Sequence, residues 1–226
     1  MDDVAVNAVD AEAYLAPELP EALRILDMPV VRATNATLKG YGCLVDDFRD
    51  FPIEIVAWPV AGWRGLDPGT GIEGGTTSGI FETWWEGDVM FGRNNAVGSN
   101  EYLFGWSCDP KLARRDRANP DRSQVLLWHM NYHPDGGQLF FPLDGGAFLC
   151  PLALPGDGVK AEDFVAFHVE GGKGLYIHPN IWHEGVFPVA ERGRFHDEQG
   201  KVHARVSCNL AKEFGVLLGV RLAPAD

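Results

Sequence analysis

The feature that most constrains the fold is a series of short, strand-like segments between residues 124 and 221, separated by turn residues. The segments are QVLLWHMNYH, QLFFPL, AFLCPLALP, two strands around the Gly-Gly-Lys-Gly turn of VKAEDFVAFHVEGGKGLYIHPNIWHEGVFPV, KVHARVSCNLA and FGVLLGVRL. Short strands at intervals of about ten residues, joined by Gly and Pro turns, are typical of a β-sandwich or β-barrel. We therefore expect an all-β fold with one barrel domain over residues 33–226.

The segments before this series predict a decorated N-terminal half. Residues 1–32 are expected to be an extension with a short helix after Pro20, a residue that suits the first helical position. IEIVAWPV and IFETWWEGDVMFGRNN are expected to form strands. The Gly-rich stretch over residues 62–79 is either a flexible loop over a site or a variable surface insertion.

The charge balance excludes some partners. Lys and Arg number 19 against 32 Asp and Glu, a net charge of −13. Such a surface repels phosphate backbones and anionic headgroups, so we expect neither nucleic-acid nor membrane binding. No apolar run approaches the length of about 20 residues that spans a bilayer, the N-terminus is acidic, and the four cysteines are scattered. These features predict a cytoplasmic protein with buried thiols rather than disulfides.

Polar side chains recur on one face of the segment QVLLWHMNYH. His129, Asn131 and His133 alternate with apolar residues. After the PDGG turn, Gln138 is expected to open the neighbouring antiparallel strand, close to His133 across a hairpin. With His183 farther along, three or four polar groups can converge inside a small barrel. Imidazoles suit Mn, Fe, Ni or Zn, and an amide oxygen can complete the shell. The alternative is that these histidines are isolated hydrogen-bonding residues.

Two arginines are candidates to bind a substrate carboxylate. Arg205 shares one face of its strand with Ser207 and Asn209, and its guanidinium could pair with a carboxylate in bidentate fashion. The alternative is a solvent-facing strand arginine. Arg93 lies in the turn FGRNNAVG, which could rim the pocket, although turn chemistry alone explains its Asn neighbours.

The order His133, Gln138 and His183 resembles the signature of the cupin superfamily, with Gln138 in the place where cupins usually carry Glu. A closer resemblance, over residues 133–188, is to the ureidoglycolate lyase family. It rests on HPDGGQLFFPLDGGAFLCPLALPGD and on FHVEGGKGLYIHPNIWHEGVFPV. The resemblance implies a cupin-type β-barrel (a double-stranded β-helix or jelly roll). It also implies a lyase that splits ureidoglycolate into glyoxylate and urea, and a homodimer.

The resemblance also implies roles for individual residues. A divalent metal ion would be held by the candidate ligands His129, His133, Gln138 and His183. His178 would transfer the proton, since an imidazole can serve as acid or base at neutral pH. Trp182, inside the family-like segment HPNIWH, would contact the substrate.

Two other classes of function stay open. Cupins also host metal-dependent isomerases and dioxygenases that act on small carboxylates. A non-catalytic, small-molecule-binding cupin is the third possibility, which the absence of a basic surface or a DNA-binding helix pair in the sequence disfavours. Metal analysis combined with product detection would separate the three.

Overall fold

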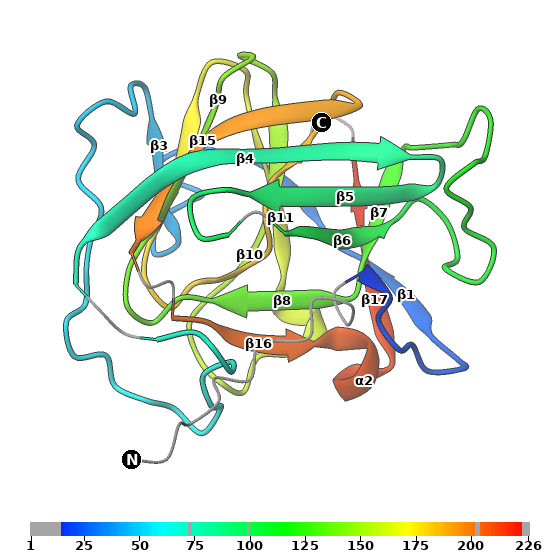
Figure 1. Ribbon diagram of the computed structural model, residues 1–226, viewed down its shortest axis with the longest axis horizontal. Coiled ribbons are helices and arrows are strands. Elements are labelled where there is room, and N and C mark those ends of the chain that lie inside the picture. The colour runs from blue at the N-terminus through cyan, green and yellow to red at the C-terminus, as the bar shows by residue number, and fades with distance from the viewer. Residues whose placement is uncertain (1–14, 72–73, 99, 202–203, 223–226) are drawn as a thin grey trace.

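Two β-sheets make up most of the computed structural model, which describes residues 15–71, 74–98, 100–201 and 204–222. Figure 1 shows β4, β5 and β6 running side by side, with β8 and β16 in the other sheet. In spatial order the larger sheet contains β1 (Arg24–Asp27), β17 (Val216–Arg221), β7 (Gln124–Leu127), β6 (Glu101–Trp106), β5 (Val89–Asn94), β4 (Thr76–Glu86), β15 (Arg192–Gly200), β9 (Gln138–Pro142), β12 (Gly174–Ile177) and β3 (Gly42–Val45).

The smaller sheet lies across from the larger one. Two short helical turns adjoin its strands in the sequence. In spatial order it contains β16 (Val206–Asn209), β8 (His129–Tyr132), β13 (Trp182–His183), β10 (Phe148–Ala153), β11 (Val165–Val169) and β2 (Val30–Arg32), with β14 (Phe187–Pro188) paired to β10. The turns are a 3-10 helix over Ala161–Asp163 and α2 over Leu210–Phe214. Among the described residues, no helix is long and apolar enough to cross a bilayer.

The strand order is that of a jelly roll. Four neighbouring strands of the larger sheet, β4-β15-β9-β12, face the four strands β8-β13-β10-β11 of the smaller sheet, and all pairs within each set are antiparallel. Two four-stranded antiparallel sheets in this arrangement define the jelly-roll architecture that cupins share. The predicted all-β, cupin-type barrel is therefore confirmed.

Aromatic side chains from both sheets fill the space between them. Phe81 is almost fully buried, and its ring centroid lies 5.4 Å from Phe140 and 5.7 Å from Phe104. Phe148 of the smaller sheet contacts Phe195 of the larger at 5.2 Å. Edge-to-face contacts of this kind stabilise a core beyond the burial of area. The rings therefore hold the two sheets at a fixed separation.

The predicted N-terminal helix is wrong for the described part of the chain. The residues after Pro20 form the strand β1, which pairs in parallel with β17, and β2 pairs in parallel with β11. Pairing with a strand far along the chain outweighs the weak helical preference of this short segment. Residues 1–14 of the predicted extension lie outside the described residues.

The segment QVLLWHMNYH is also not one strand. The chain passes from the larger sheet to the smaller at Trp128, so β7 pairs with β17 and β6 whereas β8 pairs with β16 and β13. The expected hairpin between the His133 strand and the Gln138 strand is wrong for the same reason. β9 pairs instead with β12 and β15 in the opposite sheet.

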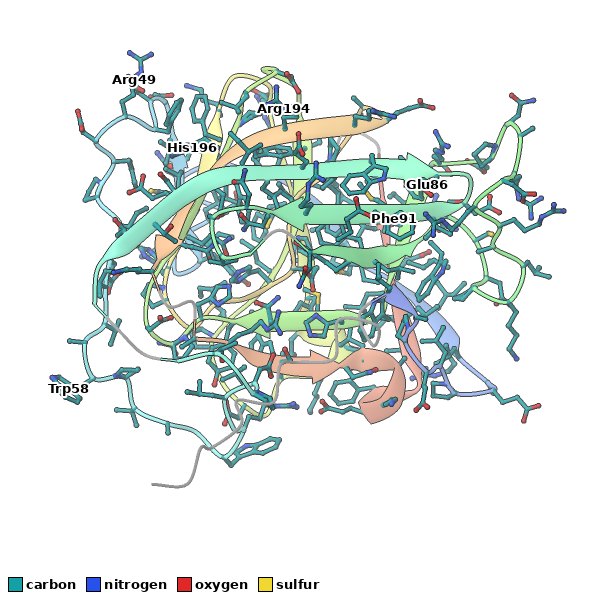
Figure 2. The ribbon with its side chains drawn as sticks, in the orientation of Figure 1. Arg49, Trp58, Glu86, Phe91, Arg194 and His196 are labelled. Carbon is teal, nitrogen blue, oxygen red and sulfur yellow. The ribbon has the colours of Figure 1, made fainter. Side chains whose placement is uncertain are left out.

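Residues 46–71 and 74–75 form a long loop around one side of the barrel. The predicted strand IEIVAWPV makes a single bridge, between Ile55 and Gly136, because no neighbouring strand continues the ladder. Trp58 projects away from the barrel and is 92% exposed (Figure 2). Farther along, Arg64 returns to the barrel, where it makes a bidentate ion pair with Glu213. The described residues of the Gly-rich stretch before β4 thus form a loop, and β4 begins at Thr76.

Candidate active site

A cavity of about 510 Å³ lies between the two sheets. Strands β4, β5, β6 and β9 of the larger sheet and β8 and β13 of the smaller sheet all contribute to its wall. Five of the eight residues predicted for the site line it, namely His129, His133, Gln138, His183 and Arg205. The predicted convergence of the polar stripe inside the barrel is therefore present in the structure.

A buried histidine and glutamate form a hydrogen-bonded pair in this cavity. His129 comes from β8, and its Nδ1 lies 2.8 Å from Oε2 of Glu184. A carboxylate accepts hydrogen bonds but donates none, so the ring carries its proton on Nδ1 and Nε2 is the basic nitrogen. Glu184 could not be predicted for the site, because side-chain alternation along a strand continued past His183 would point it away. β13 ends at His183, and the side chain of Glu184 turns into the cavity.

The other two cavity histidines are held by backbone carbonyls. Nδ1 of His133 lies 2.9 Å from the carbonyl oxygen of Ala204, and Nδ1 of His183 lies 2.7 Å from that of Ile181. A ring held in this way keeps its proton on Nδ1. The two ring centroids are 5.0 Å apart. Burial lowers the pKa of His183, so this imidazole is neutral near pH 7.

Gln138 lies between His183 and a buried carboxylate. Its Oε1 lies 3.0 Å from Nε2 of His183, and its Nε2 donates to Oδ1 of Asp197 at 2.7 Å. Asn94 and Gln199 donate to the other carboxylate oxygen. Complete burial raises the pKa of Asp197 to about 6, although the three amide donors act in the opposite direction. These contacts hold the Gln138 side chain in one orientation at the cavity.

The structure allows a direct test of whether these side chains suit a metal ion. Oε1 of Gln138 and Nε2 of His183 are 3.0 Å apart, a spacing that two ligands of one ion can adopt at metal distances of about 2.1 Å. A histidine that binds a metal through Nε2 commonly donates its Nδ1 proton to a backbone carbonyl, as His133 and His183 do here. Within the described ranges, no three His, Cys, Asp or Glu side chains group as a metal centre. Gln138 and His183 have a spacing that fits one ion, the ring of His133 lies 5.0 Å from that of His183 between centroids, and His129 pairs with Glu184.

Arg205 lies at the cavity beside the long loop. Its Nε donates to Oδ2 of Asp67 at 2.6 Å, and the hydroxyl of Ser207 donates to the same oxygen. Pro68 and Thr70, which follow Asp67 in the loop, line the cavity. The loop therefore forms part of the site, and its contact with the barrel includes the cation that we expected to bind a carboxylate.

Three predicted site residues lie elsewhere. His178 is half-exposed, packs against Tyr176, and does not appear in the cavity wall. Trp182 is fully buried outside the cavity and donates from Nε1 to the carbonyl of Gly156 at 2.9 Å. Arg93 is on the outside of β5, where it pairs with Glu82 at 2.6 Å.

Comparison with known proteins relates about half of the chain to one family. Residues 107–211 match the family model for ureidoglycolate lyase. Ureidoglycolate lyases of Salmonella enteritidis PT4 and Salmonella paratyphi B are each 33% identical over 79 residues, which is 35% of this chain and 49% of theirs. The chain thus spans about half the length of these curated relatives. Among solved structures, procruciferin, an 11S globulin from Brassica napus, aligns at 14% identity with a TM-score of 0.26, covering 38% of this chain and 21% of that chain. The matched segment, residues 107–211, carries the cavity histidines and Gln138.

Proposed function

We propose that the protein is a lyase that splits ureidoglycolate, or a closely related α-hydroxy acid, into glyoxylate and urea or the corresponding amide. The observation that carries the proposal is the buried pair of His129 and Glu184, which lies in the cavity and within the family-matched segment. A neutral imidazole held by a carboxylate is a common general base. The reaction of the named relatives requires such a base.

The reaction breaks a C–N bond and forms a C=O bond, with one proton moved between the two leaving parts. In the proposed mechanism, Nε2 of His129 takes the proton from the carbinol hydroxyl as the C–N bond breaks. The ring then donates that proton to the departing nitrogen, so the enzyme returns to its starting state. Glu184 keeps the imidazole in the required tautomer and stabilises the imidazolium that forms between the two steps.

Substrate binding is assigned to Arg205 and to the amides around it. The guanidinium of Arg205 would hold the substrate carboxylate, a strong and directional contact. Asn131, buried next to His183 in the strand pairing, can bind the carbamoyl group. A divalent metal bound by His133, His183 and Gln138 would add Lewis-acid polarisation of the substrate oxygens.

The test is the release of urea and glyoxylate from ureidoglycolate by the purified chain, with and without a chelator. We expect turnover in the parent and a loss of roughly 100-fold or more in His129→Gln. His178→Gln is the matched control, because it removes an imidazole outside the cavity, and it should keep parental activity. An inactive parent at full metal loading, or an active His129→Gln variant, would contradict the proposal. A parent that loses activity on chelation would assign the metal a part in the reaction.

A further inference from the structure

The cavity is much larger than ureidoglycolate requires. Its volume of about 510 Å³ equals the space of roughly 17 water molecules at about 30 Å³ each. Ureidoglycolate has about nine non-hydrogen atoms, so it would leave much of this space to solvent. Pockets of this size commonly enclose ligands of drug-like dimensions. The unused volume calls for a substrate with a second, larger part.

Two parts of the cavity wall differ in chemistry. One part, the polar end, contains the His129–Glu184 pair and the imidazole of His183. The other part is a wall of aromatic rings, in which Tyr102 and Phe104 have centroids 5.1 Å apart and Phe104 and Phe81 have centroids 5.7 Å apart. This wall adjoins the polar end, because a Cβ at Gly185, next to Glu184, would meet ring atoms of Phe104 at 2.4 Å. Rings packed edge to face are rigid and present an apolar surface that suits another planar or branched apolar group.

This aromatic wall comes from strands that precede the family-matched segment. Tyr102 and Phe104 are on β6, and Phe81 is on β4, whereas the match begins at residue 107. The polar end, which performs the proposed chemistry, lies inside the match. The family resemblance therefore supports the reactive group of the substrate and leaves its other end to be determined by this wall.

The charge at the cavity wall favours a neutral group beside the rings. Glu101 lines the cavity at the start of β6, where its half-exposed carboxylate lies 3.8 Å from the guanidinium of Arg93. Because Arg93 pairs more closely with Glu82, at 2.6 Å, the carboxylate of Glu101 would still repel a second acidic group on the substrate. One carboxylate, at Arg205, and one uncharged apolar group therefore suit the charges that line the site.

We propose that the substrate is an N-acyl-α-hydroxyglycine whose acyl group is aromatic or branched and apolar. This inference rests on the proposed lyase function. The substrate R–CO–NH–CH(OH)–COO⁻ would give R–CO–NH₂ and glyoxylate: the C–N bond breaks, the hydroxyl oxygen forms the aldehyde C=O bond, and the hydroxyl proton moves to the departing nitrogen. No other reactant is needed. Ureidoglycolate has the same reactive group with an amino group in place of R.

The test compares N-benzoyl-α-hydroxyglycine with ureidoglycolate by the rate of glyoxylate release from the full chain. We expect kcat/KM for the benzoyl compound to be higher by at least roughly tenfold, since an enclosed apolar group contributes that much discrimination or more. Equal or lower kcat/KM for the benzoyl compound would overturn the inference and leave the proposed lyase function standing.

A matched pair of variants tests whether the effect depends on an apolar residue of the cavity lining. Val97 lines the cavity and Val189 does not, and both side chains are 38% exposed. Val97→Ser should lower the ratio of the two kcat/KM values by roughly fivefold, because Val97 is partly open to solvent and a fully enclosed methylene contributes more. Val189→Ser should leave the ratio unchanged. If the ratio falls equally in both variants, or in neither, the cavity lining does not cause the preference for the benzoyl compound. That result would refute the inference.

If neither compound is cleaved, the proposed function fails and binding decides the inference separately. The unreactive analogues N-benzoylglycine and N-carbamoylglycine lack the carbinol hydroxyl, and their affinities can be compared by calorimetry. Tighter binding of the benzoyl analogue, weakened by Val97→Ser, would support the apolar end of the substrate. Equal affinities, or no binding of either analogue, would overturn it.

Discussion

Replacing Glu184 with Gln should slow turnover by roughly 30- to 150-fold while the fold is retained. The new amide oxygen can still accept the hydrogen bond from Nδ1 of His129, so the tautomer does not change. What is lost is the charge opposite the imidazolium. Two unit charges about 4 Å apart attract by about 4 kcal/mol at an effective dielectric constant of about 20, and the amide dipole recovers about 1–2 kcal/mol. The remaining 2–3 kcal/mol or so corresponds to the stated loss at about 1.4 kcal/mol per factor of ten.

The variant should also lose a little stability, because the amide nitrogen would face the backbone N–H of Gly185, which now donates to Oε1 at 3.2 Å. This mismatch costs about 1 kcal/mol. The assay is steady-state glyoxylate release, with a urea melt to confirm folding. His129→Gln and the double variant complete a cycle. Because the carboxylate acts through the imidazole, the double variant should be no slower than His129→Gln. A fully active Glu184→Gln protein, or additive losses in the double variant, would refute this reasoning.

The remaining predictions concern substrate binding, pH and the loop. Arg205→Gln should raise KM more than it lowers kcat. The expected loss in kcat/KM is roughly 10- to 100-fold, because a hydrogen bond to a charged group contributes about 1.5–3 kcal/mol. An equal loss with a substrate analogue whose carboxylate is replaced by an amide would count against a contact between Arg205 and the carboxylate. Burial raises the pKa of Asp197 from 3.8 to about 6, so the folded state holds this proton more tightly than the unfolded state. The stability that the protonated carboxyl contributes is therefore full below about pH 4 and declines as the pH rises through about 6. The free energy of unfolding should fall by about 3 kcal/mol across that window relative to Asp197→Asn in urea melts, and parallel pH curves for the two proteins would exclude Asp197 as the group. Arg64→Ala should lower the stability by about 1–2 kcal/mol, since the ion pair is bidentate and only Glu213, at 36% exposure, is open to solvent while Arg64 is 9% exposed. An unchanged urea midpoint would show that the ion pair does not hold the loop.

The alternation of side chains in a strand was enough to find the polar side of the site. His129 and His133 share a face by their spacing, and that face points into the cavity even though the chain changes sheets at Trp128. The sheet change itself was not predictable, because it depends on pairing with β16 and β17, which lie far along the chain. Local patterns therefore identified the residues but placed Gln138 in the wrong sheet.

The missed acidic residues have two different causes. Glu184 follows a strand of two residues, and the adjacent Gly185 was the available signal, because a Cβ there would meet ring atoms of Phe104 at 2.4 Å. Asp197 lies in the polar sequence RGRFHDEQG, which reads as an exposed loop. This sequence instead forms β15, whose Asp197 is buried because β4 and β9 pair with β15 on either side. Such long-range pairing leaves no trace in a local pattern.

The parallel pairing of β1 with β17 sets an order for folding during synthesis. Arg24 pairs with Val216, so about 190 residues separate two strands that are neighbours in the sheet. On the ribosome, β1 emerges early and waits for the C-terminal strand with its edge unsatisfied. The strands β4, β5 and β6 follow one another in the chain and can pair as soon as they are made. The pairing of β1 with β17 is therefore the last step in completing the larger sheet. Until that step, the edge of β1 that pairs with β17 stays uncovered in the nascent chain.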